Sequence, residues 1–134
     1  MEKRISVAPM MGQTDRHFRY MISLLANDVR LYTPMIHADA IVYSDKNFIK
    51  NENHNQKAVG IQIAGSDPDI VTSAAKIIEQ HNYNEINLNV GCPSARVQNC
   101  SVGATLMKEP QRVAKIIERL KKTTNLPVSI KTRI

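Results

Sequence analysis

The sequence is poor in aromatic residues and in cysteine. It contains no tryptophan, two phenylalanines and four tyrosines, too few to build the stacking platform that proteins use to bind single-stranded nucleic acid. The two cysteines, Cys92 and Cys100, cannot form a disulfide framework, and neither stands in a CxxC pair. With only two cysteines, a zinc site would also need histidines at matched spacings, and the four histidines here are scattered. We therefore expect no bound metal.

Long apolar segments are also missing. No apolar run approaches the roughly 20 residues that cross a bilayer. The N-terminal segment turns polar from Gly12 to Asp15, before the core of a signal peptide is complete. The sequence therefore predicts a cytoplasmic protein that does not enter a membrane. With 134 residues, 43% of them apolar, the chain is sufficient for one folded domain.

Positive charge is concentrated near the end of the sequence. The chain has 18 basic and 12 acidic residues, for a net charge of +6. Residues 108–134 hold two acidic residues, Glu109 and Glu118, and these basic residues: Lys108, Arg112, Lys115, Arg119, Lys121, Lys122, Lys131 and Arg133. The excess indicates either a contact with RNA phosphates or a solvated helix face whose last lysines suit the helix dipole. We favour the helix face.

Extended and helical segments alternate along the chain. Helices are predicted where apolar residues recur at helical spacing: after Thr14 as N-cap, after the Asp67-Pro68 pair, and from Pro110. The first helix is expected to bury a stripe of Phe18, Met21, Ile22 and Leu25. The segment 37–58 is predicted to form a short helix and an exposed loop. Strands are predicted at 5–10, 31–36, 59–64, 85–90 and 128–133. This alternation is typical of a parallel α/β fold.

The predicted strands carry polar residues at every second position. These residues are Gln62, then Glu85, Asn87 and Asn89, then Ser129, Lys131 and Arg133. An open doubly wound sheet meets helices on both faces, so its strands read as continuous apolar runs. The alternation instead favours a closed barrel with a polar interior. The polar residues gather toward the carboxyl ends of the strands, the active-site face of a (β/α)8 barrel.

The segment Asn89-Val90-Gly91-Cys92-Pro93-Ser94 carries a resemblance to a known family. With it, the chain resembles the tRNA-dihydrouridine synthases, above all the branch that acts on D-loop positions 20 and 20a. Further matching segments are 8–11, 14–17, 31–35, 62–68, 85–93, 96–99 and 103–107, together with Lys131 and Arg133. Two positions depart from the family pattern: Ala95, where an acidic residue is usual, and Cys100, where glycine is usual.

The resemblance implies a fold, cofactors and roles for particular residues. It implies the N-terminal half of a (β/α)8 TIM barrel, with about five parallel strands and flanking helices. The implied reaction is the FMN-dependent reduction of uridine to 5,6-dihydrouridine in tRNA, with NADPH as electron donor. The implied roles are as follows: Pro9, Met10 and Met11 line the flavin, Gln62 and Lys131 bind its ring edge, Asn89 and Arg96 contact the tRNA, and Cys92 is the general acid.

The implied reaction, reduction of a uracil ring, itself requires a hydride donor and a proton donor, and a flavin and a thiol can fill these roles. Reduction of the C5=C6 bond of uracil needs a hydride on one face and a proton on the other, and no side chain supplies hydride. A cysteine thiol has an ordinary pKa near 8.5, so at neutral pH it is mostly protonated and can act as an acid. The target base is stacked in folded RNA and must be flipped out to reach the barrel. For Cys100 we expect only a small buried side chain.

Length is where the sequence departs most from the family. A complete barrel takes about 250 residues, so residues 1–134 are expected to form a partial flavin-binding barrel, without the C-terminal barrel half and a helical RNA-binding domain. We expect such a chain to be inactive alone, and to self-associate or to pair with the other barrel half. Two alternatives stay open. One is another flavin barrel of the dihydroorotate dehydrogenase type, and the other is a half-barrel without catalysis of its own.

Overall fold

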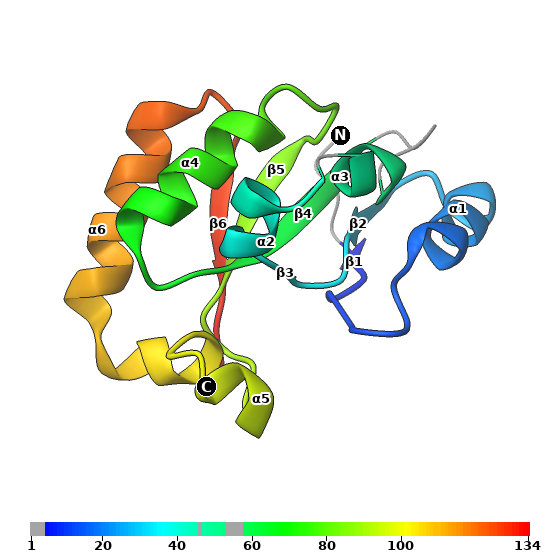
Figure 1. The fold of residues 1–134 in the computed structure, drawn as a ribbon. Helices are drawn as coiled ribbons and strands as arrows, with labels where there is room; N and C mark the ends of the chain where they lie inside the picture. Colours follow the sequence, from blue (N-terminus) through cyan, green and yellow to red (C-terminus); the bar gives the residue numbers. More distant parts are fainter. Residues whose placement is uncertain (1–4, 46, 53–57) are drawn as a thin grey trace.

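The computed structural model describes residues 5–45, 47–52 and 58–134 (Figure 1). The strands are β1 Ile5–Ser6, β2 Val29–Tyr32, β3 Ile36–His37, β4 Val59–Ala64, β5 Glu85–Asn89 and β6 Val128–Lys131. The helices are α1 Arg16–Leu25, α2 Ala38–Tyr43, α3 Asn47–Glu52, α4 Pro68–Ile78, α5 Ala95–Gln98, the 3₁₀-helix η1 Gly103–Lys108 and α6 Pro110–Thr123. No helix within the described ranges is long and apolar enough to cross a membrane.

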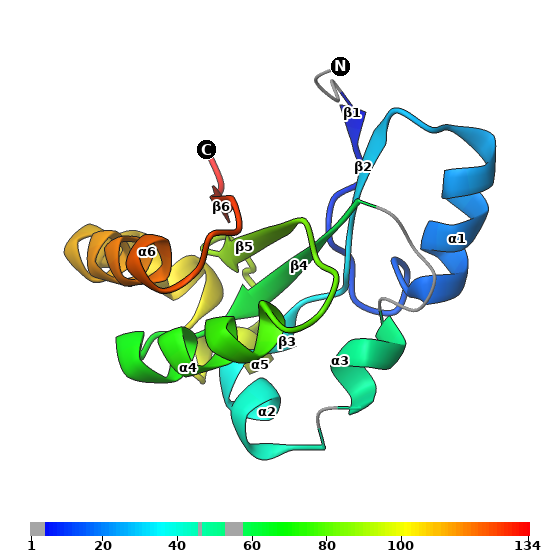
Figure 2. The same cartoon turned by 90° about the horizontal axis from the view of Figure 1, so that it is seen from above.

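The strands form one parallel sheet that follows the order of the chain. The order is β1-β2-β4-β5-β6, with β3 also paired to β4, and every pairing is parallel. A doubly wound sheet reverses its strand order, and this sheet does not. Seen along the strands, the sheet curves and its helices lie on the outer side (Figure 2). This arrangement confirms the predicted half of a (β/α)8 barrel.

The core lies between the curved sheet and the helices on its outer side. It is built by the apolar residues of the two central strands, Val59, Ile61, Ile63, Ile86 and Leu88, and by the inner faces of α4 and α6, including Val71, Ala74, Ile78, Ile116 and Leu120. The other face of the same strands carries Gln62, Asn87 and Asn89. The alternation predicted for these strands is therefore confirmed.

Two helix starts are confirmed and one is corrected. Asp67 caps α4, with Pro68 in the first turn, and Pro110 begins α6. The cap of α1 is Asp15, whose carboxylate accepts a 2.8 Å hydrogen bond from the amide of Phe18. This bond lowers the pKa of Asp15. The predicted cap, Thr14, is fully buried and serves the preceding turn instead.

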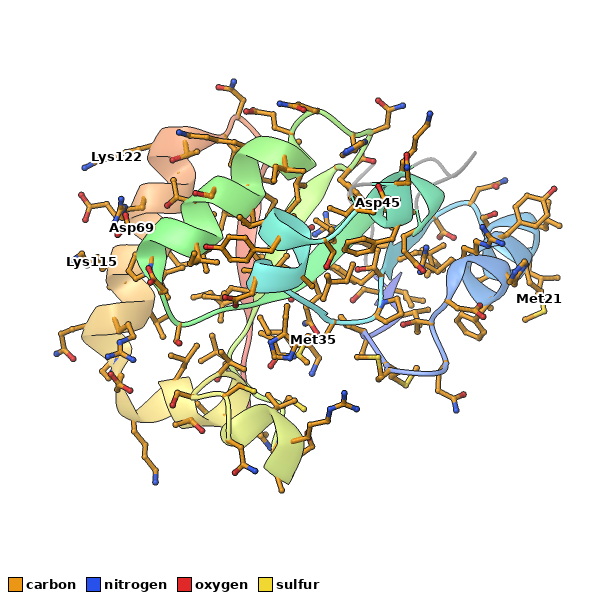
Figure 3. The ribbon with its side chains drawn as sticks, in the orientation of Figure 1. Met21, Met35, Asp45, Asp69, Lys115 and Lys122 are labelled. Carbon is orange, nitrogen blue, oxygen red and sulfur yellow. The ribbon has the colours of Figure 1, made fainter. Side chains whose placement is uncertain are left out.

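The apolar stripe predicted for α1 is only partly buried. Met21 and Leu25 are 49% and 76% exposed, and Met21 points away from the sheet in Figure 3. The helix instead buries Arg19 completely, against α3. The expected burial of the whole stripe was therefore wrong for Met21 and Leu25, whereas Phe18 and Ile22 are half-buried and α1 contacts β2.

The predicted strand 31–36 is divided into β2 and β3. Pro34 has no amide hydrogen to donate to the neighbouring strand. At this break the hydroxyl of Thr33 accepts a 3.1 Å hydrogen bond from the amide of Gln62. β2 then pairs with the beginning of β4, and β3 pairs with its end.

The segment 37–58 holds more helix than expected. It contains both α2 and α3, where one short helix and a loop were predicted. Part of the expected loop, 53–57, lies outside the described residues. Two further short helices, α5 and η1, follow β5 and were not predicted. Each is too short for helical periodicity to be visible in the sequence.

The sheet ends at β1 on one side and at β6 on the other, as far as the described residues show. Ile5 of β1 is 64% exposed and Ile130 of β6 is 43% exposed. Open strand edges with apolar side chains are typical sites of association. Self-association or pairing with a second barrel half therefore stays a prediction, which light scattering tests.

Candidate active site

A cavity of about 890 Å³ opens on the concave side of the sheet, at the carboxyl ends of the strands. Its walls come from the ends of β3, β4, β5 and β6 and from the loops that follow β1 and β5. The predicted site residues that line it are Pro9, Met11, Gln62, Asn89, Cys92, Arg96 and Lys131. Met10 does not line it. The structure thus brings residues from five strands or strand ends to one place, although they are far apart in the sequence.

A ladder of amide side chains begins in the cavity wall, at Asn89 and Gln62, and continues along the sheet. Asn89 donates from Nδ2 to Oε1 of Gln62 at 2.9 Å, and Gln62 donates from Nε2 to Oδ1 of Asn87 at 2.7 Å. Asn87 in turn donates to the hydroxyl of Ser129 at 2.7 Å. Each rung joins neighbouring strands β4, β5 and β6. Buried polar groups require such partners, so the ladder fixes the orientation of every amide in it.

The ladder continues to a charged group below the cavity. Glu85 accepts hydrogen bonds from Ser129 and, at 2.9 Å, from the hydroxyl of Tyr32. Its other oxygen lies 3.2 Å from Nη1 of Arg30. Burial raises the pKa of Tyr32, and the bond to Glu85 acts in the same direction while Arg30 opposes it. Glu85 is therefore a structural carboxylate with three partners, and it lies away from the cavity that Cys92 lines.

The two cysteines lie in different surroundings. Cys92 is half-buried in the cavity wall, and its thiol donates to the hydroxyl of Ser94 at 3.6 Å. Cys100 is exposed, and its thiol donates to the carbonyl of Arg96 at 3.5 Å. The expectation that Cys100 is a buried apolar residue was wrong. It lies just beyond the short helix α5, where the chain turns at the surface.

The loop after β1 is held by hydrogen bonds between side chains and its backbone. The hydroxyl of Thr14 accepts from the amide of Met10 at 2.9 Å and donates to the carbonyl of the same residue at 3.1 Å. Arg19 donates to the carbonyl of Thr14 at 2.5 Å. Met10 is thus the fixed point of the turn, while its neighbours Pro9 and Met11 face the cavity.

Sequence reasoning missed several residues of the cavity wall as site residues. They include Met35, His37, Ser94 and Arg133. Met35 lies at the carboxyl end of the sheet, between α2 and α5 in the view of Figure 3. The available signal was position, since each lies at or near the carboxyl end of a predicted strand, and such ends build the active-site face of a barrel.

Three of the eight basic residues near the end of the chain form ion pairs with residues that the structure describes. Arg112 pairs with Glu109 at 3.1 Å, Lys122 pairs with Glu118 at 2.6 Å, and Arg119 pairs with Asp69 of α4. Lys115, Lys122 and Asp69 lie together on the outer surface (Figure 3). These pairs favour the solvated helix face over a dedicated RNA contact. Lys131 lies elsewhere, in the cavity wall.

Within the described part of the chain, no group of three or more histidine, cysteine or acidic side chains is placed to hold a metal ion. A polar cavity at the carboxyl ends of parallel strands, with helices on the outer side, is the active-site position of (β/α)8-barrel enzymes. The fold and the site together define this class.

Comparison with known proteins assigns the chain more narrowly. Residues 6–134 match the family described as Dihydrouridine synthase (Dus), and the chain belongs to this family. It is 45% identical over 130 residues to a protein of Synechocystis, 45% over 131 residues to one of Vibrio vulnificus, and 46% over 132 residues to one of Yersinia pestis. Each of these relatives is named tRNA-dihydrouridine(20/20a) synthase.

The matches cover nearly all of this chain but less than half of each relative. They include 97% of the chain and 39% of the Synechocystis protein, and 98% of the chain and 38% of the Yersinia pestis protein. The chain therefore spans about two fifths of the length of these relatives.

Proposed function

We propose that this chain forms the flavin-ring and uracil end of a tRNA-dihydrouridine synthase, an oxidoreductase that reduces a D-loop uridine of tRNA with FMN and NADPH. The observation that carries the proposal is the convergence of Cys92, Asn89, Gln62 and Lys131 on one cavity at the carboxyl end of the sheet. The family and the names of the relatives support the substrate. The proposed setting is the cytoplasm.

The cavity fits a flavin ring. Its volume of about 890 Å³ lies in the range of cofactor sites, which combine apolar walls with a few placed polar groups. Pro9, Met11 and Met35 supply apolar wall. Gln62 is 1% exposed, and its amide keeps one hydrogen and one lone pair that its two bonds in the ladder do not use. A polar ring edge satisfies both.

Charge in the cavity also suits a reduced flavin. When bound, reduced FMN supplies the hydride that no side chain can supply. Lys131 is exposed at the cavity wall and forms no ion pair within the described residues. An ammonium near the pyrimidine edge of the ring would stabilise negative charge there. Gln62 and Lys131 are the residues that would hold this edge.

Cys92 is the proposed proton donor. Its thiol lies in the wall of the same cavity, where it can give its proton to C5 of a uracil ring while the hydride adds to C6. The bond from sulfur to hydrogen breaks, the new C5–H bond forms, and the thiolate takes a proton back from solvent. Cys92 and the neighbouring Ser94 are open enough to water for this return.

The substrate side of the cavity is polar and accessible. Arg96, on α5, is exposed and lines the cavity mouth, so its guanidinium is available to an RNA phosphate. Asn89 lies deeper, at 8% exposure. A uridine that reaches this depth must leave its stack in the RNA. We therefore propose that Arg96 contacts the tRNA at the cavity mouth and that Asn89 contacts the flipped uridine inside the cavity.

The division of the enzyme into parts is also proposed. β2 and β3 both pair with β4, so the described residues supply five strand positions of a barrel. Phosphate sites in such barrels typically lie in the loops after strands seven and eight. In the relatives, those strands and a helical RNA-binding domain are expected in the part that this chain does not match. The ring site would then lie within residues 1–134 and the phosphate site outside this range.

The first prediction follows from this division. The 134-residue chain alone is expected to bind FMN weakly, because apolar ring contacts without a phosphate site seldom give tight affinity. Titration followed by flavin fluorescence measures it, with riboflavin as the matched ligand that lacks the phosphate. FMN and riboflavin are expected to bind equally within about threefold. Stoichiometric FMN that survives gel filtration contradicts the division.

The test of the function uses a chimera. Residues 1–134 replace the matching 130-residue segment of the Synechocystis protein, and the chimera is assayed with FMN, NADPH and unmodified tRNA. Dihydrouridine in the product tRNA supports the proposal. Oxidation of free dihydroorotate without reaction on tRNA supports the dihydroorotate dehydrogenase alternative. No reaction in a folded, FMN-loaded chimera supports the half-barrel without catalysis.

A further inference from the structure

Asn89 is bonded to the backbone that carries Cys92. Its Oδ1 accepts hydrogen bonds from the amide of Gly91 at 3.1 Å and from the amide of Cys92 at 3.0 Å. Its Nδ2 donates to Gln62 at 2.9 Å. An asparagine side chain offers two hydrogens and two lone pairs, and three of these four are used here. Most of the hydrogen-bonding capacity of Asn89 is therefore used by the loop after β5 and by Gln62 of the ladder.

The carbonyl of Cys92 is held from the other side. It accepts a 2.9 Å hydrogen bond from the amide of Ala104, at the start of η1. The chain approaches closely here because Gly103 has a positive φ of 66°, and a Cβ at this position would meet the Cys92 carbonyl oxygen at 2.7 Å. Only glycine fits this approach without strain.

Gly91 is also fixed by close packing. A Cβ at this position would lie 3.1 Å from the carbonyl carbon of Thr132 and 3.1 Å from Cγ of Arg133. The loop thus passes tightly against the end of β6. The amide of Val90 donates to the carbonyl of Lys131 at 2.9 Å, so the strand pairing continues up to this point.

We propose that hydrogen bonds hold the backbone of Cys92 at both of its peptide groups, and that Asn89 is the positioning residue. We call these hydrogen bonds the clamp: those from the amides of Gly91 and Cys92 to Asn89, and the one from the amide of Ala104 to the carbonyl of Cys92. The role of the clamp in catalysis rests on the proposed function, in which the Cys92 thiol is the proton donor. In the clamped loop only the Cys92 side chain can rotate. In a mobile loop that closes over the substrate, the backbone of Cys92 would move as well. Misplacement by about 1 Å costs about 10²-fold in rate, so a fixed backbone serves the proton transfer directly.

The same amide couples the proton donor to the cofactor side of the cavity. Asn89 joins Cys92 to Gln62, and Gln62 is the residue proposed to meet the flavin ring. The ring edge and the thiol are then positioned by one hydrogen-bonded unit on β4 and β5. The unused Nδ2 hydrogen of Asn89 is the one group of this side chain left for a uracil oxygen.

Amide hydrogen exchange of the 134-residue chain tests the clamp. In Asn89→Ala, the amides of Gly91 and Cys92 are expected to exchange about tenfold faster or more relative to the amides of β4, because both lose their acceptor. Asn89→Asp keeps the acceptor and loses both amide hydrogens. It is expected to retain protection at Gly91 and Cys92 within about threefold.

Asn87→Ala is the matched control. Asn87 also bonds Gln62 from β5 but does not bond the loop, so this variant is expected to weaken the ladder while the relative protection of Gly91 and Cys92 stays unchanged. Unchanged protection in Asn89→Ala, or equal losses in Asn89→Ala and Asn87→Ala, overturns the proposal. If Asn89→Ala does not fold, loss of protection in folded Asn89→Asp overturns it equally.

Thiol alkylation gives a second readout in the same molecule. Cys92 is expected to react with iodoacetamide several-fold faster in Asn89→Ala, because its half-buried position depends on the clamp. Cys100 is exposed and does not contact Asn89, so its rate is the internal reference. A Cys92 to Cys100 rate ratio equal to that of the unsubstituted chain contradicts the clamp. Neither readout involves FMN or tRNA, so the clamp and the proposed function fail separately.

Discussion

Replacing Cys92 with alanine is expected to lower dihydrouridine formation by the chimera by about 10²–10⁴-fold, the loss typical of a general acid. The reduction of bound FMN by NADPH is expected to stay nearly unchanged, because that half-reaction uses only nicotinamide and flavin. The two half-reactions are measured separately, by flavin absorbance under anaerobic conditions and by dihydrouridine in the product tRNA. A selective loss in the second locates Cys92 in the proton transfer.

Cys100→Ala is the matched control for this substitution. Cys100 lies eight residues further along the chain, is exposed, and lies outside the cavity that Cys92 lines. Both half-reactions are expected to stay within about twofold of the unsubstituted chimera. Unchanged tRNA reduction in Cys92→Ala, or a large loss in Cys100→Ala alone, refutes the assignment of the acid.

Replacing Arg19 with alanine is expected to lower the free energy of unfolding of the 134-residue chain by about 3–5 kcal/mol. The Arg19 side chain is fully buried, donates to the carbonyls of Thr14 and Glu52, and pairs with the Glu52 carboxylate at 3.3 Å. The substitution removes these contacts together and leaves a cavity between α1 and α3. Urea denaturation followed by circular dichroism measures the change.

An exposed arginine pair provides the comparison. Arg112 pairs with Glu109 at 3.1 Å, and both side chains are about two fifths exposed. Arg112→Ala is expected to cost less than about 1 kcal/mol, as surface ion pairs do. Arg19→Lys keeps the charge but loses the planar fork that reaches two carbonyls, so an intermediate loss is expected. Equal effects of Arg19→Ala and Arg112→Ala refute a structural role for the buried pair.

The parts of the fold that the sequence predicts are those with local signals. Gln62, Asn87 and Asn89 alternate with apolar residues at a period of two, and this pattern identified the polar face of the sheet. Asp67 and Pro110 mark helix starts through local capping chemistry. Such signals depend only on neighbouring residues in the sequence, so they can be recognised without knowledge of the tertiary structure.

The features that escaped prediction depend on contacts between distant residues. The burial of Arg19 requires Glu52, 33 residues away, and no local pattern in α1 reveals it. The break at Pro34 has a local cause in the missing amide hydrogen of proline, but the pairing of β2 and β3 with different ends of β4 depends on contacts between distant residues. Likewise, the motif around Cys92 identified Asn89 as a site residue, but only the structure shows that its oxygen holds the loop.

The most direct test of the account is the content of dihydrouridine in tRNA from a bacterial strain that lacks its own dihydrouridine synthases and expresses the chimera. Mass spectrometry of D-loop fragments is predicted to show a uridine that has gained two hydrogen atoms with the unsubstituted segment, and unmodified uridine with Cys92→Ala. Fully unmodified tRNA from cells in which the unsubstituted chimera is folded and loaded with FMN contradicts the account.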